Sequence, residues 1–231
     1  MTGTLTAKKT FQAVIFDLDG TLFDSLIDLS EAMNEVLRGQ GFPLHPPDSY
    51  RYFVGDGMEK LVIRALPEKA RGDRETVSNC LDLMRSAYSR RWDRNSALYP
   101  GIPALLDGLV AHHLALAIFS NKPQTFTVAV QEKYLAAWPF LQVLGASSEH
   151  PLKPDPAGAL AIARKLGLTP EAILYLGDSA IDMRTAQAAG MYAIGCLWGF
   201  REKSELVEAG ARLLLTCPEE LLAWWNSRFA G

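Results

Sequence analysis

The sequence has little cysteine, no long apolar run and no large excess of either charge. Its three cysteines, Cys80, Cys196 and Cys217, are widely separated and form no CxxC pair, which argues against a disulfide framework or a structural zinc site. No window of about 18 uncharged apolar residues predicts a transmembrane helix. Lys and Arg number 23 and Asp and Glu 26 in 231 residues, so no basic surface attracts duplex nucleic acid or anionic membrane. We expect a cytoplasmic globular protein that binds neither.

Short apolar runs recur along the chain and predict buried strands. Unbroken runs of this length suit strands covered on both faces, as in a parallel sheet, and they are Ala13–Phe16, Leu114–Phe119, Ile173–Leu176, Ala193–Leu197 and the weaker Gln142–Gly145. Helical patterns lie between them at Ile102–His112, Pro156–Leu166 and Asp182–Ala189, and a last helix is expected at Leu221–Phe229. This alternation predicts an α/β fold with a doubly wound parallel sheet.

Residues 25–95 differ from the rest because they show amphipathic helices and no strand. The apolar spacing predicts one helix from Leu26 to Leu37 and further helices at Met58–Leu66 and Glu75–Tyr88. At about 150 residues per domain, the chain length corresponds to about 1.5 domains. We therefore predict a core of residues 1–24 and 96–231, interrupted by an all-helical domain of residues 25–95.

Two acids, Asp17 and Asp19, follow the first apolar run with only Leu18 between them. Side chains at positions i and i+2 of an extended chain point the same way, so the two carboxylates are expected to lie together. Their mutual repulsion would be offset by a divalent cation. The same segment, ending in Gly20, could also be an ordinary turn.

A second acidic pair strengthens the functional interpretation. Asp178 and Asp182 follow the apolar run at Ile173–Leu176, and parallel strands would bring them beside Asp17 and Asp19. Four carboxylates without histidine or cysteine suit Mg²⁺ better than zinc.

Anion-binding groups follow other predicted strands and loops. Ser120 and Asn121 end a third apolar run, and Lys153 lies in a loop before Pro154. A hydroxyl, an amide, backbone N–H groups and a lysine can hold phosphate oxygens. Together with the acids, this set matches phosphoryl transfer, which needs a nucleophile, a general acid/base, a metal and anion binders.

These motifs resemble the haloacid dehalogenase-like (HAD) superfamily, in their order and over nearly the whole chain. The segments that carry the resemblance are Asp17-Leu18-Asp19-Gly20-Thr21, Ser120-Asn121, Lys153 and Gly177-Asp178-Ser179-Ala180-Ile181-Asp182. The helical insertion resembles the family's C1-type cap on a Rossmann-like core. Further segments resemble the phosphoglycolate phosphatase branch, namely Asp24-Ser25, Gly55-Asp56-Gly57 and Ala188-Ala189-Gly190-Met191.

The resemblance implies a role for each motif residue. Asp17 is expected to attack phosphorus and form an aspartyl-phosphate, and Asp19 to protonate the leaving alcohol and then activate water. Mg²⁺ is expected on Asp17, the Asp19 carbonyl and Asp178, with Asp182 supporting the metal's water shell or orienting Lys153. The phosphoryl oxygens would be held by Ser120, the Asn121 backbone and Lys153.

The inserted helices are expected to select the substrate. The loop Gly55-Asp56-Gly57 is predicted to close over the site, because glycines allow close backbone approach. Arg51 lies near it in sequence and could pair with a substrate carboxylate. Asp24 is interpreted as a helix cap.

The expected activity is Mg²⁺-dependent hydrolysis of a small phosphorylated metabolite, 2-phosphoglycolate, by a monomer or homodimer. A HAD-type phosphomutase, pyrophosphatase or nucleotidase remains open on the same scaffold. Outside enzymes, the alternatives are a receiver-like phospho-acceptor module and a scaffold retained for protein interaction. Receivers lack an acid equivalent to Asp19 and carry no helical insertion.

Overall fold

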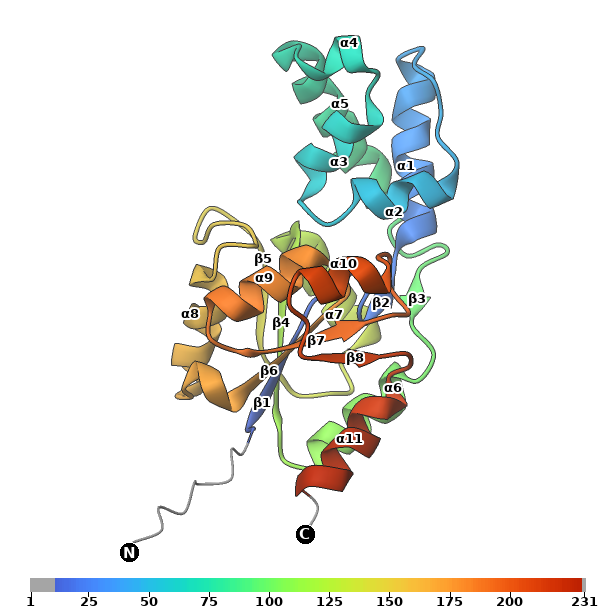
Figure 1. Ribbon diagram of the computed structural model, residues 1–231. Coiled ribbons are helices and arrows are strands. Elements are labelled where there is room, and N and C mark those ends of the chain that lie inside the picture. The colour runs from blue at the N-terminus through green and yellow to red at the C-terminus, as the bar shows by residue number, and fades with distance from the viewer. Residues whose placement is uncertain (1–10, 230–231) are drawn as a thin grey trace, which may run out of the picture.

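The computed structural model describes residues 11–229 and shows an α/β core with a helical part above one edge of its sheet (Figure 1). The first ten residues of the predicted core lie outside the described residues. The sheet has the order β5-β4-β1-β6-β7-β8, and every neighbouring pair is parallel. Its strands are β1 (Ala13–Phe16), β4 (Ala115–Pro123), β5 (Phe140–Ala146), β6 (Ile173–Gly177), β7 (Tyr192–Cys196) and β8 (Leu213–Leu215). The predicted doubly wound parallel sheet is confirmed.

Helices cover both faces of this sheet, so the strands need apolar side chains on both sides. The core helices are α6 (Ile102–Ala111), α7 (Gln124–Tyr134), α8 (Ala157–Leu166), α9 (Ala180–Ala188), α10 (Lys203–Glu208) and α11 (Glu219–Phe229), with a short 3₁₀ turn η2 at Pro170–Ala172. Alternate side chains of a strand point to opposite faces. Val14 and Phe16 accordingly pack with α6 and α11, while Ala13 and Ile15 pack with α8 and α9. All four are fully buried.

The inserted helices have a separate apolar core. They are α1 (Leu26–Gly39), the 3₁₀ turn η1 (Pro47–Ser49), α2 (Tyr50–Phe53), α3 (Met58–Ala65), α4 (Glu68–Arg71) and α5 (Arg74–Ser89). Met33, Tyr50 and Met84 are fully buried among them. The chain enters and leaves this part through a two-stranded antiparallel pair, β2 (Phe23–Asp24) and β3 (Ala97–Leu98). The predicted domain boundaries fall beside these two short strands.

Several elements of the core differ from the predicted ones. Helices α7 and α10 and strands β2, β3 and β8 were not predicted. The predicted β5, α9 and α11 each began two residues late, at Gln142, Asp182 and Leu221. In α7 only Thr127 and Val130 are buried, so the apolar periodicity that marks a helix is weak there. Strand β8 has three residues at the sheet edge, too few for a strand pattern.

The cysteines form no disulfide, and no helix within residues 11–229 is a candidate membrane span. All three cysteines are free thiols, which agrees with the absence of a disulfide framework. None of the helices within residues 11–229 combines the length and apolar character needed to cross a lipid bilayer.

A buried carboxylate links the start of the first inserted helix to the segment by which the chain returns to the core. Asp28, near the start of α1, accepts four hydrogen bonds: from the backbone N–H and side-chain amide of Asn95, at 2.9 Å each, and from the Ser96 N–H at 3.0 Å and hydroxyl at 2.6 Å. Burial raises the pKa of Asp28, but the hydrogen bonds from Ser96 and Asn95 outweigh it and hold this pKa below its ordinary value. The outgoing helix is thereby fixed to the returning chain.

Replacing Asp28 by asparagine is expected to destabilise the protein by about 2–4 kcal/mol, because an amide NH₂ would face N–H donors inside the structure. Because the pKa of Asp28 is lower in the folded protein, its charged form stabilises the fold at pH values above the ordinary pKa of 3.8. This stabilisation is lost as the pH falls through the lower pKa of the folded state. Urea unfolding of the wild type and Asp28→Asn should therefore show a stability gap at pH 7 that shrinks below about pH 4. The exposed Asp82→Asn is the matched control, and an equally small loss in both variants would contradict the account.

Candidate active site

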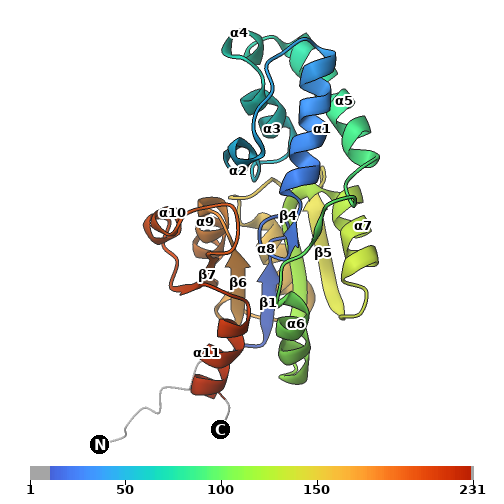
Figure 2. The ribbon, with the colours of Figure 1, turned by 90° about the vertical axis from the view of Figure 1, so that its right-hand side faces the viewer.

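The carboxyl ends of β1, β4 and β6 meet at the sheet edge that faces the inserted helices (Figure 2). Asp17 directly follows β1, Asp178 directly follows β6, and Ser120 lies in the last part of β4. All three are buried. The convergence expected from the parallel order is therefore present, at the edge where open α/β sheets bind ligands.

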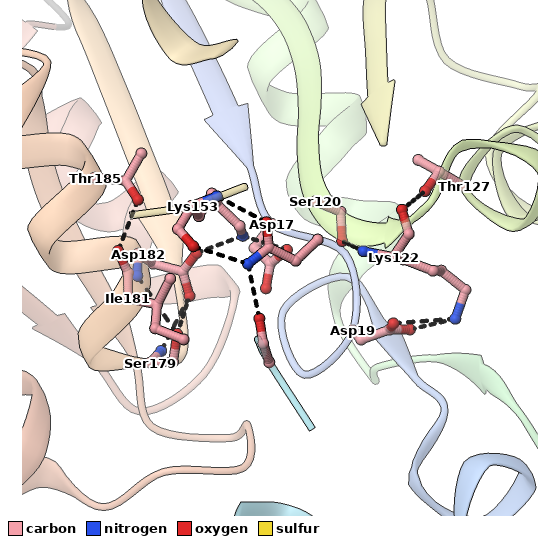
Figure 3. Close-up of polar contacts among 12 residues, drawn as sticks. Asp17, Asp19, Ser120, Lys122, Thr127, Lys153, Ser179, Ile181, Asp182 and Thr185 are labelled. Carbon is pink, nitrogen blue, oxygen red and sulfur yellow. Dashed lines mark hydrogen bonds and ion pairs between the residues drawn. The ribbon is translucent and has the colours of Figure 1, made fainter. Parts of the chain in front are cut away.

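A buried lysine lies between two carboxylates at this edge. The Nζ atom of Lys153 is 2.7 Å from Asp17 Oδ1 and 2.7 Å from Asp182 Oδ1 (Figure 3). Its side chain is only 2% exposed, so solvent and salt screen these attractions weakly. Burial lowers the pKa of Lys153, but the charges of Asp17 and Asp182 outweigh it and raise that pKa well above 10.5. The ammonium is a fixed positive charge against Asp17.

Asp182 uses both of its oxygens within the protein. Oδ1 accepts from Lys153, and Oδ2 accepts from the Ser179 hydroxyl at 2.6 Å and the Ser179 N–H at 3.2 Å. Ser179 is the N-cap of α9, and its side chain in turn accepts from the Asp182 N–H, which completes a capping box. The helix start thus orients Asp182, and Asp182 orients Lys153.

Three acids form a cluster that fits a divalent cation. Asp17, Asp178 and Asp182 each offer a carboxylate oxygen, and these oxygens lie within 4.8 Å of one another. Asp178 Oδ2 accepts from the Phe200 N–H at 2.7 Å. A Cβ atom at Gly20 would lie 2.3 Å from the same oxygen, so only glycine permits this approach. Three buried carboxylates opposed by one ammonium leave an excess of negative charge for a hard cation.

The burial of the cluster and its excess of negative charge raise the pKa values of two of its acids, Asp17 and Asp178. Burial, opposed by Lys153 and reinforced by Asp182, raises the pKa of Asp17 from 3.8 to about 6. Burial and the charges of Asp182 and Asp17 raise the pKa of Asp178 well above its ordinary value. A bound cation would favour the charged forms of both.

The carboxylate of Asp19 lies apart from this cluster, so the expected group of four acids has three members. Asp19 accepts from Lys122 Nζ at 2.9 and 3.0 Å (Figure 3). It also accepts from the Ser25 hydroxyl at 2.7 Å. The rule that positions i and i+2 share a side holds for extended chain, but β1 ends at Phe16. After it the Leu18 carbonyl accepts three N–H groups in a tight turn, which separates the two acids.

Ser120 and Asn121 occupy the site in different ways. The Ser120 hydroxyl accepts the Lys122 N–H at 3.2 Å and lines the pocket described below. The Asn121 amide donates to the carbonyls of Gly55 and Lys153 at 3.0 and 3.1 Å, and its oxygen accepts the Lys153 N–H at 2.8 Å. The Asn121 side chain therefore fastens the Lys153 loop and the Gly55 loop to β4.

Lys122 and Tyr88 also belong to this site and were not among the predicted residues. Lys122 Nζ contacts Asp19 and also donates to the hydroxyl of Tyr88 at 2.7 Å, and Tyr88 comes from α5 of the inserted part. Both side chains are buried. A charged residue directly after Ser120-Asn121 at the end of an apolar strand was a usable signal for Lys122. Nothing in the sequence marked Tyr88, whose position looks like any core residue of an amphipathic helix.

A pocket between core and inserted helices opens onto these groups. Its core side is lined by Asp17, Asp19, Ser120, Asn121 and Lys122, and its other side by the apolar Leu29, Val54, Met58 and Leu61 with Tyr88 and the loop glycines Gly55 and Gly57. Both acids predicted to be catalytic therefore face one pocket, roofed by the inserted helices.

Comparison with known proteins identifies the family. Residues 14–196 match the family model described as haloacid dehalogenase-like hydrolase. The chain belongs to this family. The predicted superfamily and its α/β core are thereby confirmed, and the sheet-edge site lies where the motifs of the HAD resemblance meet.

Several HAD relatives carry one name. The chain is 34% identical over 194 residues to a phosphoglycolate phosphatase from Psychrobacter arcticus, covering 82% of this chain and 84% of the relative. It is 33% identical to one from Pseudomonas putida, covering 81% and 70%. A crystal structure of a predicted phosphoglycolate phosphatase from Haemophilus somnus superposes with a TM-score of 0.86 at 26% identity, covering 93% and 97%. The expected phosphatase-type HAD hydrolase is confirmed.

The loop expected to close over the HAD site is only partly as predicted. Gly55 and Gly57 line the pocket with φ of 119° and 90°, a left-handed conformation that favours glycine. Asp56, however, pairs with Arg64 of α3. Arg51 is not among the residues that line the pocket. It donates to the Gly199 carbonyl at 3.0 Å, and its Nε lies 3.6 Å from Asp48 Oδ1. Asp24 accepts the Leu26 N–H at 3.3 Å, while the residue at the N-cap of α1 is Ser25.

A core loop after β7 binds the inserted part next to the acidic cluster. Arg201 donates to the Val54 carbonyl at 2.9 Å and lies over the Tyr52 ring at 5.1 Å. The Phe200 ring packs among the inserted helices while its N–H holds Asp178. The position of the inserted helices is therefore tied to a carboxylate of the cluster through Phe200.

In metal-free buffer, Asp17→Asn is expected to stabilise the protein at neutral pH. A rise of the Asp17 pKa from 3.8 to about 6 means that the folded state holds this proton more tightly than the unfolded state. Stability is therefore lost as pH rises from about 4 to 6, by about 3 kcal/mol in total. In urea titrations with a chelator present, the free energy of unfolding of the variant should rise relative to that of the wild type between pH 4.5 and 7. A wild type more stable than the variant at pH 7 would contradict the account.

Proposed function

We propose that the chain is a Mg²⁺-dependent phosphatase that hydrolyses a small phosphate monoester, 2-phosphoglycolate, through an aspartyl-phosphate on Asp17. The observation that carries this proposal is the contact between Asp17 and Lys153 at 2.7 Å, in a buried site whose pocket also contains Asp19. A nucleophilic carboxylate and a second acid face one pocket. The names of the relatives support the choice of substrate.

The donor set supports Mg²⁺ at Asp17 and Asp178, with the backbone carbonyl of Asp19 as a third protein ligand. Asp182 suits the alternative role of orienting Lys153, because both of its oxygens already accept hydrogen bonds. When bound, Mg²⁺ would neutralise charge on the nucleophile and on the phosphoryl oxygens.

The protein's own groups account for both half-reactions. An Asp17 oxygen attacks phosphorus as the bond to the leaving oxygen breaks, and Asp19 gives that oxygen a proton. Lys153, the Ser120 hydroxyl and the Asn121 backbone N–H hold the equatorial oxygens, where charge is greatest in a loose transition state. Asp19 then takes a proton from water as the water oxygen attacks the phosphoryl group, which releases phosphate and restores Asp17.

The surroundings of Asp19 suit this second role. Ser25 and Lys122 hold its carboxylate on the pocket side of the turn, away from the acidic cluster and toward the space for a leaving group. The apolar wall of the inserted helices restricts water there, which favours reaction with a bound substrate.

Burst kinetics separate the two acids. Asp19→Asn is expected to lower steady-state turnover of an alkyl phosphate by about 10²–10⁴-fold. With an aryl phosphate, whose phenolate leaves without a proton, the same variant should release one equivalent of phenolate and then stall. Asp17→Asn, or wild type in chelator, should give no burst. A burst from Asp17→Asn would exclude Asp17 as nucleophile, and absence of turnover by wild type across a panel of monoesters with Mg²⁺ would refute the proposed phosphatase.

The same panel separates the other activities on this scaffold. A phosphomutase would transfer the phosphoryl group to a second hydroxyl and release little phosphate. A pyrophosphatase or nucleotidase would prefer pyrophosphate or nucleotides to small carboxylate-bearing monoesters. A receiver-like module would keep the phosphoryl group on Asp17 without turnover.

A further inference from the structure

We propose that Lys122, together with the hydroxyl of Tyr88, binds a second anionic group of the substrate, its carboxylate. This inference rests on the proposed function, since it concerns the part of a phosphate monoester that is not transferred. It assigns substrate selection to a lysine of β4 and a tyrosine of α5, instead of to Arg51.

Lys122 is placed to meet a substrate in the pocket. It lies two residues beyond Ser120 on β4 and lines the same pocket as Asp17 and Asp19. Among the lining residues within 11–229 it is the one cation. The other cations nearby are engaged elsewhere: Lys153 with Asp17 and Asp182, and Arg51 with Gly199.

The hydrogen bonding of the Lys122–Tyr88 pair leaves one donor, the Tyr88 O–H, for an anion next to the Lys122 ammonium. An ammonium has three N–H donors, and Nζ donates to both carboxylate oxygens of Asp19, at 2.9 and 3.0 Å, and to the Tyr88 hydroxyl at 2.7 Å. Tyr88 accepts from Lys122, and its own O–H has no acceptor among residues 11–229. The Tyr88 O–H therefore remains for one oxygen of a substrate carboxylate, and the Lys122 ammonium beside it supplies the positive charge that attracts this anion.

The rest of the pocket favours a short anionic substrate. Its wall opposite the acids is apolar, formed by Leu29, Val54, Met58 and Leu61. A sugar or nucleoside with several hydroxyls would leave them without partners against this wall, which costs free energy. In a short substrate, the carboxylate would instead meet Lys122 while the phosphate meets Asp17 and Ser120, which line the same pocket.

Tyr88 also makes this subsite depend on the inserted helices. It is fully buried and comes from α5, whereas Lys122 comes from the sheet. The two donors are adjacent only when the inserted part lies against the core. Selection of the carboxylate and enclosure of the site would therefore occur together.

The test compares 2-phosphoglycolate with ethyl phosphate, which has a similar length and no carboxylate. The measured quantity is the ratio of kcat/KM for the two substrates, so that any general loss of activity cancels. Lys122→Met should lower the ratio by about 30-fold or more, and Tyr88→Phe by about 3- to 10-fold. Lys122→Arg should restore part of the loss. If Lys122→Met does not fold, as judged by circular dichroism, Tyr88→Phe provides the same comparison.

Ser25→Ala is the matched control. Ser25 contacts Asp19, as Lys122 does, but is not part of the proposed subsite. Its loss should lower activity on both substrates equally and leave the ratio unchanged. A ratio equally unchanged in Lys122→Met and Tyr88→Phe would overturn the inference and leave the phosphatase proposal intact. Failure of the wild type to hydrolyse either substrate would overturn the proposed function, and this inference with it.

Discussion

The buried contact of Lys153 with Asp17 and Asp182 is the interaction on which the rest of the site depends. Removing three charges from water costs several kcal/mol per ion unless each is well paired. The fold meets this requirement by ending three strands at one edge, by capping α9 with Ser179 so that Asp182 is oriented, and by fastening the Lys153 loop through Asn121. One ammonium cannot balance three acids, and the remaining negative charge makes the edge a place for a divalent cation.

The inserted helices complete a site that the core only begins. Asp17, Asp178 and Lys153 belong to the core, but the apolar wall and Tyr88 come from the insertion. Two connections fix the parts together: Asp28 holds the returning chain at Ser96, and the loop containing Phe200 and Arg201 bonds to the insertion beside Asp178. A change in the position of the insertion would therefore act on both the wall of the pocket and the acidic cluster.

The sequence could predict most of the sheet edge because strand order determines it. Buried apolar runs followed by acids imply parallel strands, and parallel strands bring Asp17, Asp178 and Ser120 together. What could not be predicted depends on local chain direction and on contacts across the two parts. The turn after Phe16 sends Asp19 away from Asp17, and Arg51 is drawn to the Gly199 carbonyl. Tyr88 looks like ordinary helix core until α5 is placed against β4. Lys122 could have been predicted, because burying a lysine at the end of an apolar strand costs free energy unless its charge is paired.

The central claim is that Asp17 is phosphorylated during turnover, and borohydride trapping tests it most directly. Wild-type enzyme mixed with Mg²⁺ and 2-phosphoglycolate, quenched within a turnover and reduced with borohydride, should yield homoserine in place of Asp17 in the peptide that contains residues 11–24. Substrate-free enzyme should not. Phosphate release with Asp17 unmodified at every quench time, or reduction at a different carboxylate, would contradict the account.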